Sequence, residues 1–189
     1  MKIFGALIAA LACCATACST TSTSTTGNSV GGNMVNGVSF NVVDGAAMVR
    51  TSRGLTNIVL TDFADTCSIA DESSHAMSTE LAFLVTDDVS AGSSGIPPSK
   101  PGTYTVSTVA NQPASGPAAQ CGFAVLDSTC HPLPASARCE SGTITLVRVD
   151  AQGYAGTFDV VIAGAHVTGS FDAPGCSNGN SESGFGSCH

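Results

Sequence analysis

Apolar and polar residues alternate along most of the chain between residues 38 and 172. Every second side chain of a strand points to the same face of a sheet, so this alternation predicts strands with one buried face. Nine such strands with one helical stretch among them predict an all-β domain, either an antiparallel β-sandwich or an open barrel. The predicted strands are residues 38–43, 46–51, 55–60, 79–86, 102–108, 120–127, 143–149, 154–163 and 166–172.

One helix is expected, over residues 62–75, with Asp62 as its N-cap. Its serine and β-branched residues are poor helix formers, so the helix should be short. The strand that follows, residues 79–86, carries Ala82 and Leu84 on the face that should be polar. This pattern predicts burial of that strand on both sides.

The first predicted hairpin depends on the dipeptide Asp44-Gly45. Asp-Gly is typical of a type I′ turn, which requires positive φ at both central residues. The turn would join residues 38–43 to residues 46–51 and place Phe40 opposite Val49.

A meander of three strands is predicted near the end of the chain. A type II′ turn at Gly164-Ala165 would place Phe158 opposite Phe171. A three-residue loop ending at Gly153 would place Phe158 opposite Leu146 on the other side. The residues predicted to face the core are Ile144, Leu146, Phe158, Val160, Ile162, Val167 and Phe171.

The charge composition of the chain argues against one class of binding partner. Charged residues make up 11% of the chain, and 14 acidic residues against 6 basic ones give a formal net charge of −8. An acidic domain repels phosphate backbones, so nucleic acid is not an expected partner. No apolar run reaches the roughly 18 residues that a membrane-spanning helix needs.

The N-terminus is typical of an export signal: Lys2 precedes the uncharged apolar run 3–11. The tetrapeptide ending in Cys18, Ala-Thr-Ala-Cys, resembles a bacterial lipobox. Cys13, after Ala10-Leu11-Ala12, and Cys14, after Leu11-Ala12-Cys13, remain alternatives for the lipidated cysteine. Cys18 is favoured because it lies beyond the whole apolar run and leaves an even number of cysteines after it.

The lipobox resemblance implies a mature lipoprotein. Cleavage would follow Ala17, and Cys18 would carry a diacylglyceryl thioether and an acylated amino group with chains such as palmitate. Ser19, in place of an aspartate, implies the outer membrane, facing the periplasm or the cell surface. The predicted organisation is a signal peptide (1–17), a lipid anchor with a Ser/Thr/Gly-rich tether (18–35), one β domain (36–176) and a Gly/Ser-rich tail (177–189).

Six cysteines remain in the mature chain, and in an oxidising envelope they should form three disulfides. Six cysteines allow fifteen pairings, which the spacing does not distinguish. A bridge at Cys188 would pin the tail. Metal binding is the alternative, with His131 and His189 as candidate ligands beside cysteines, although no C-x-x-C spacing supports it. The six are Cys67, Cys121, Cys130, Cys139, Cys176 and Cys188.

The order of features resembles an uncharacterised group of bacterial lipoproteins. The shared segments are VLTDFADTC, GTYTV and the closing SGTITLVRVDAQGYAGTFDVVIAGAHVTGSFDAPGC. The resemblance covers most of the mature chain and implies a structural similarity without an activity.

The motifs S-x-x-K and H-E-x-x-H are missing, and the two G-x-S-x-G matches, at residues 27–31 and 175–179, do not lie between a predicted strand and a predicted helix, as a nucleophile elbow requires. No cofactor and no catalytic residue are therefore predicted. The favoured function is a non-catalytic envelope module that is anchored to the membrane through Cys18 and binds an envelope protein or glycan. The alternatives are a metal-binding or redox protein acting through Cys/His loops, and a hydrolase without a recognisable motif.

Overall fold

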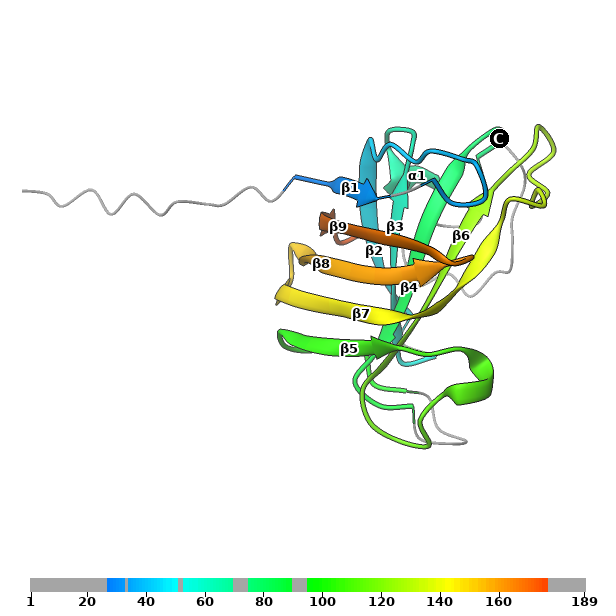
Figure 1. Ribbon diagram of the computed structural model, residues 1–189. Coiled ribbons are helices and arrows are strands. Elements are labelled where there is room, and N and C mark those ends of the chain that lie inside the picture. Colours follow the sequence, from blue (N-terminus) through cyan, green and yellow to red (C-terminus); the bar gives the residue numbers. More distant parts are fainter. Residues whose placement is uncertain (1–26, 33, 51–52, 70–74, 90–94, 177–189) are drawn as a thin grey trace, which may run out of the picture.

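The computed structural model describes residues 27–32, 34–50, 53–69, 75–89 and 95–176. Within them the chain forms a nine-stranded sheet in the order β1-β9-β8-β7-β5-β6-β4-β3-β2 (Figure 1). The described helices are α1 (Thr66–Ile69) and the 3-10 turn η1 (Val109–Asn111). The strands are β1 (Ser29–Gly32), β2 (Asp44–Arg50), β3 (Leu55–Thr61), β4 (Thr79–Thr86), β5 (Gly102–Val106), β6 (Ala118–Val125), β7 (Ala137–Asp150), β8 (Gly153–Ile162) and β9 (Ala165–Pro174).

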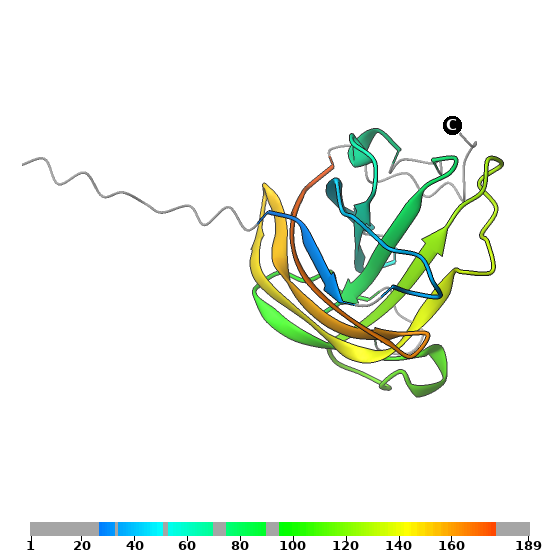
Figure 2. The same ribbon diagram turned by 45° about the horizontal axis from the view of Figure 1, so that its top comes forward.

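The sheet curls until its two ends approach each other (Figure 2). Ala47 on β2 forms a parallel bridge with Gly175, and the Cys176 amide donates to the Ala47 carbonyl over 2.9 Å. A disulfide between Cys67 and Cys176 joins α1 to the same place. The all-β prediction is confirmed, and of its two architectures the open barrel, a single curled sheet, is the one observed.

β7 is the longest strand and changes partners along its length. Its first residues pair with β6 at Arg138, and residues 142–146 pair with β5. Register shifts at Cys139/Ser141 and Leu146/Arg148 interrupt its ladder with β8. Such bulges bend a strand, which allows β7 to cross from one neighbour to the next. β5 and β6 are parallel where Val106 pairs with Ala119, so the sheet is not wholly antiparallel.

Aliphatic side chains and phenylalanine rings fill the inside of the barrel. All seven residues predicted for the core of the C-terminal meander are buried. Phe83 lies at the centre with no exposed surface, and its ring centroid is 5.0 Å from that of Phe158 and 6.2 Å from that of Phe171. The predicted interior faces of the meander are therefore confirmed.

The predicted register between β8 and β9 is wrong by two residues. Phe158 pairs with Gly169 and Phe171 pairs with Gly156, because the turn is Ala163-Gly164. Both turn residues have positive φ, 48° and 74°, as a type I′ turn requires. A shift of two keeps every side chain on its face, so the interior residues are unchanged.

Each ring in this meander lies over a glycine, and this explains the observed register. A Cβ atom on Gly169 would lie 2.5 Å from Cζ of Phe158, and one on Gly156 would lie 2.9 Å from Cζ of Phe171. The repeated Gly-x-Phe pattern therefore gives two ring-over-glycine pairs, not the predicted aromatic pair.

The Gly169→Ala variant is expected to lower the free energy of unfolding by about 1–3 kcal/mol, because the added methyl group collides with the Ser29 carbonyl oxygen on β1 and overpacks the Phe158 ring. Gly31→Ala on the adjacent strand is the matched control. The nearest atom to a Cβ there is Thr168 Oγ1, at 3.7 Å. Urea unfolding of both variants measures the difference, and equal losses would contradict the ring-over-glycine packing.

The turn before Tyr154 also differs from its prediction. Asp150 pairs with Gly153, which leaves a two-residue loop, and Phe158 lies opposite Ile144 instead of Leu146. The bulge at Val147 takes up the extra residue, so the apolar side chains still face the core.

The predicted hairpin at Asp44-Gly45 is wrong. These residues begin β2, which pairs with β3, and residues 38–43 are not a strand. The Asp44 carboxylate instead accepts hydrogen bonds from the Thr66 amide and the Gly45 amide, each at 2.8 Å. The tight turn lies at Asn36-Gly37, where Val35 and Val38 exchange both backbone hydrogen bonds.

The N-terminal boundary and the helix differ as well. β1 lies inside the segment expected to be tether and pairs with β9. The helix is only α1, and residues 70–74 of the predicted span lie outside the described residues. Asp62 does not cap it, because its Oδ1 accepts from the Thr79 amide over 2.9 Å. Asp44 is the carboxylate that accepts from the Thr66 amide at the helix start.

Glu80 on β4 supplies a test of pH dependence. Burial raises the pKa of its carboxyl group, and the nearby Asp62 raises it further, against a hydrogen bond from Ser78 and the proximity of His75. A raised carboxyl pKa makes the charged form costly in the folded state, so stability is lost as pH rises through that pKa.

Glu80→Gln is therefore expected to melt at a higher temperature than the wild type at pH 7, with the difference disappearing near pH 4. Melting curves of both proteins across this range measure it. A difference that stays constant with pH would show that the charge of Glu80 is not its cause.

Candidate functional site

A pocket lies on the outer face of the barrel, where β7 leaves β6 and turns toward β5. Its volume is about 360 Å³. Pockets for small ligands span about 300–1,000 Å³, so this one suits a small ligand. Its lining residues come from β3, β4, β6, β7 and the end of β5: Asn57, Ala82, Leu84, Ser107, Thr108, Gln120, Cys121, Gly122, Arg138 and Cys139.

Strand register explains why a hollow forms here. Across β4, β6 and β7, Ala82 pairs with Gly122 and Gly122 pairs with Arg138, so small residues occupy the middle of this outward-facing row. A Cβ atom on Gly122 would meet only the Ala137 carbonyl, at 3.8 Å. Leu84, which was predicted to be buried, is 37% exposed because its face of β4 opens on this pocket.

Two polar atoms of the lining are buried without a hydrogen-bond partner. They are Oδ1 of Asn57, on β3, and Oγ of Ser107, directly after β5. A buried polar atom without a partner costs about 1–3 kcal/mol, and most such atoms in proteins are satisfied. Each atom has less than 1 Å² of exposed surface, so a ligand in the pocket can supply the missing partners once the two side chains rotate toward it.

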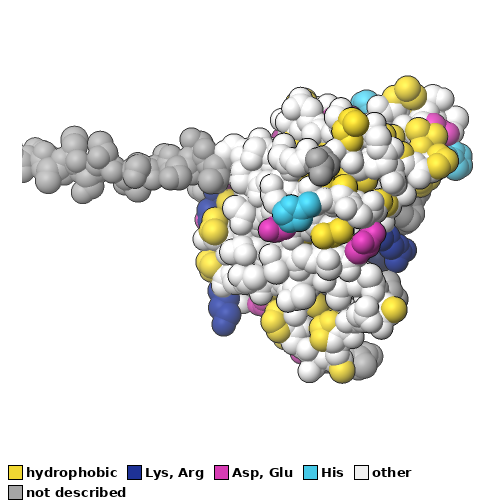
Figure 3. All heavy atoms as spheres, in the orientation of Figure 1, with side chains coloured by type: hydrophobic (Ala, Val, Ile, Leu, Met, Phe, Trp, Pro, Cys, Tyr) yellow, Lys and Arg dark blue, Asp and Glu magenta, His cyan; other side chains and the backbone are white. Residues whose placement is uncertain are grey.

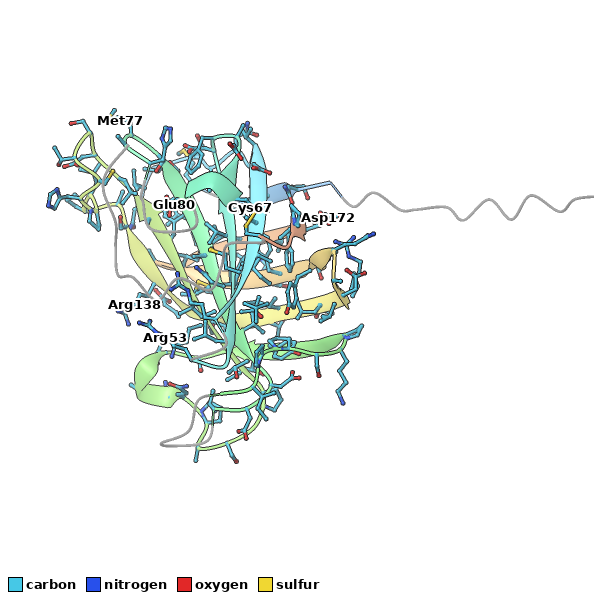
Figure 4. All side chains as sticks on the ribbon, turned by 180° about the vertical axis from the view of Figure 1, so that it is seen from behind. Arg53, Cys67, Met77, Glu80, Arg138 and Asp172 are labelled. Atoms are coloured by element: carbon cyan, nitrogen blue, oxygen red, sulfur yellow. A yellow bond between two sulfur atoms is a disulfide. The ribbon has the colours of Figure 1, made fainter. Side chains whose placement is uncertain are left out.

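The lining carries a positive charge in an otherwise acidic protein. Arg138 is exposed at the pocket and is in none of the ion pairs of the described residues. The lining contains no aspartate or glutamate, although the chain has a net charge of −8. Seen from behind, Arg138 and Arg53 lie toward the same side of the barrel (Figure 4). The pocket therefore favours an anionic group.

The opposite face of the barrel is uncharged over most of its area (Figure 3). One row across β5, β7, β8, β9 and β1 consists entirely of hydroxyl side chains. Two pairs within the row are hydrogen-bonded, at 3.1 Å and 2.8 Å. Beside the row, His166 contacts Asp159 over 2.6 Å in an exposed pair. The row is Thr103, Thr145, Thr157, Ser170 and Ser29.

The cysteines act as cross-links in the described residues. Cys67 pairs with Cys176 and Cys121 pairs with Cys139, with Cα–Cα distances of 5.4 Å and 5.2 Å. Cys130 is also disulfide-bonded. Cys188 and the proposed anchor Cys18 lie outside the described residues.

His131 lies in the loop between β6 and β7, where Asp127 organises the turn. The Asp127 carboxylate accepts hydrogen bonds from the Thr129 hydroxyl and from the amides of Thr129 and His131, and these bonds lower its pKa. The ring of His131 contacts the Thr129 hydroxyl at 2.8 Å. Over the described part of the chain, no three His, Cys, Asp or Glu residues are grouped to hold a metal ion, and His189 lies outside that part.

Sequence reasoning missed the pocket residues. Asn57 was the one sequence signal for the pocket. Asparagine is unfavourable in the middle of a strand such as Leu-Thr-Asn-Ile-Val-Leu-Thr, so its presence there suggests a specific role. Ser107 and Arg138 gave no signal, since they join the site only through the contacts of β5, β6 and β7.

The described residues form a small all-β barrel with cross-linking disulfides and a pocket on its outer face. No protein-family model, curated protein or solved structure matches the chain. Within the described residues, no helix has the length and apolar character required to cross a membrane.

Proposed function

We propose that this chain is an exported lipoprotein of the bacterial envelope whose barrel is a non-catalytic binding module. The outer pocket is its binding site. The observation that carries this function is the pair of buried, unpaired polar atoms, Asn57 Oδ1 and Ser107 Oγ, in the lining of the 360 Å³ pocket. A site with unmet hydrogen bonds is suited to hold a ligand.

Two features support export and anchoring. The apolar leader followed by Cys18 resembles a lipoprotein signal. Disulfides persist in oxidising compartments and are rare in the cytosol, so the bridges Cys67–Cys176 and Cys121–Cys139 agree with an envelope location. Several acyl chains on one cysteine would hold the barrel stably at the outer membrane.

The chemistry of the pocket supports binding over catalysis. The lining offers amide, hydroxyl, guanidinium and aliphatic groups, and its two cysteines are consumed in a disulfide. It includes no histidine or carboxylate, the groups that most often transfer protons in enzymes.

Anchoring is tested by fractionating cells that express the full chain or its Cys18→Ala variant. The wild type should sediment with membranes and be released by detergent, whereas the variant should not be lipidated and should leave the membrane fraction. Retention of both in the membrane, or recovery of the wild type from the cytosol, would contradict the anchoring.

Binding is tested with Gly122→Leu, which fills the pocket at a position where the backbone leaves room. An enzymatic digest of the cell wall should raise the melting temperature of the wild type and leave that of Gly122→Leu unchanged. Gly31→Ala, on the edge strand β1, should respond like the wild type. An equal response of wild type and Gly122→Leu, or no response of the wild type, would contradict the pocket's role.

A further inference from the structure

We infer that the outer pocket binds the C-terminus of a short peptide whose last residues have small apolar side chains. This inference rests on the proposed binding function and names the ligand class. The recognised features are the terminal carboxylate, one peptide amide and one small apolar side chain.

Arg138 accounts for the carboxylate. Its guanidinium group is the only full charge in the lining, and no carboxylate of the lining neutralises it. Arginine presents paired N–H donors that match the two oxygens of a carboxylate, and such charge-assisted bonds are stronger than neutral ones. A cationic ligand would meet the like charge of Arg138 and no carboxylate in this lining.

Asn57 and Ser107 account for a peptide group. The buried Oδ1 of Asn57 lacks a donor, and a peptide N–H supplies one when the Asn57 amide rotates toward the pocket. The unpaired Oγ of Ser107 can donate to a peptide carbonyl. Inorganic phosphate or a simple carboxylic acid at neutral pH offers acceptors for Arg138 but no N–H donor for Asn57.

The rest of the wall has a small apolar part beside Thr108 and Gln120. Ala82, Leu84 and the Cys121–Cys139 disulfide form it, and the lining has no aromatic ring on which a sugar could stack. A methyl or similarly short side chain suits this wall, which favours a peptide over a sugar acid that would also carry a carboxylate and donors.

The dimensions agree with a dipeptide. Asn57 and Arg138 lie on strands three places apart, because β4 and β6 stand between β3 and β7. At about 4.8 Å per strand this is about 14 Å across the sheet, and an offset of two residues along the strands makes it about 16 Å between backbones. Their own side chains span part of that distance, and two residues of extended chain, about 7 Å, can bridge the rest.

The test measures binding of N-acetyl-Ala-Ala to the mature chain purified from the envelope in detergent. Its C-terminal amide, glucuronic acid and inorganic phosphate are the comparison ligands. The free acid should bind at least tenfold tighter than the amide and tighter than glucuronic acid or phosphate. Arg138→Gln should lose this preference and bind acid and amide equally, whereas Lys100→Gln, which changes an exposed cation outside the lining, should keep it.

Asn57→Leu separates ligand binding from a structural role. It should weaken binding of the acid at least tenfold while leaving the melting temperature of the free protein equal or higher, because an unpaired buried acceptor is removed. A lower melting temperature together with unchanged affinity would show that Asn57 serves the fold alone and would overturn its role here.

The outcomes separate the ligand class from the binding function. If the cell-wall digest stabilises the wild type but not Gly122→Leu, while the dipeptide acid fails to bind or binds no better than its amide, the peptide is wrong and the binding function stands. Tighter binding of glucuronic acid or phosphate would likewise overturn the peptide. If the digest also has no effect, both proposals fail.

Discussion

Replacing Cys67 and Cys176 together by alanine is expected to lower the free energy of unfolding by about 4–5 kcal/mol. The two cysteines are separated by 109 residues, so their bridge restricts most of the domain in the unfolded state. It also holds α1 to the end of β9, where Cys176 contacts Ala47 on β2 and closes the barrel. Urea unfolding without reductant measures the loss.

The second bridge supplies the matched control. Cys121 and Cys139 are separated by only 18 residues and lie on adjacent strands, so removing both should cost about 3 kcal/mol. A larger loss for this short bridge than for Cys67–Cys176 would show that closing the barrel is not the main effect of the long one.

Phe83→Ala is expected to lower the free energy of unfolding by about 3–5 kcal/mol, because it leaves a cavity at the centre of the barrel. Phe83 has no exposed surface, and its ring contacts those of Phe158 on β8 and Phe171 on β9. These contacts cross the interior between β4 and the C-terminal meander. Chemical denaturation of the variant measures the effect.

Phe63→Ala is the control for residue type. The Phe63 ring stacks on His75 at a centroid distance of 4.4 Å, outside the core cluster and partly exposed. Its removal should cost less than half as much as that of Phe83. Equal losses would place the centre of the core elsewhere.

The alternation of the sequence predicted the strands and their buried faces well, because side-chain direction repeats every two residues whatever the strand pairs with. Register was harder. Phe158 was expected opposite Phe171 and lies opposite Gly169, since the choice between two neighbouring turns shifts pairing by two residues without changing faces. The Phe158 and Phe171 rings each occupy the space beside a glycine of the paired strand, and this packing favours the observed turn. The sequence alone does not show it.

Local turn signals failed where a tertiary contact outweighed them. Asp44-Gly45 is a good turn dipeptide, but the Asp44 carboxylate bonds the Thr66 amide, and the pair begins a strand instead. Asn36-Gly37 carries an equally good signal and does form a tight turn. The sequence alone does not distinguish the two, because residue 66 is distant in the chain.

The pocket could not be predicted for a related reason. Its residues come together because β4 lies beside β6 and β7 crosses from β6 to β5, an order that alternation does not encode. Arg138 and Asn57 are 81 positions apart in the sequence and meet only through that order. The cysteines were predicted as cross-links, and the structure supplies two of the pairings that their spacing left open, Cys67–Cys176 and Cys121–Cys139.

Mass analysis of the chain isolated from its native envelope, with thiols alkylated before any reduction, tests most directly whether this barrel is delivered oxidised and anchored. The account predicts an N-terminal Cys18 carrying acyl chains, no alkylated thiol, and peptides linked as Cys67–Cys176, Cys121–Cys139 and, by elimination for the bonded Cys130, Cys130–Cys188. A chain that begins at Met1 without lipid and with alkylated cysteines would contradict it.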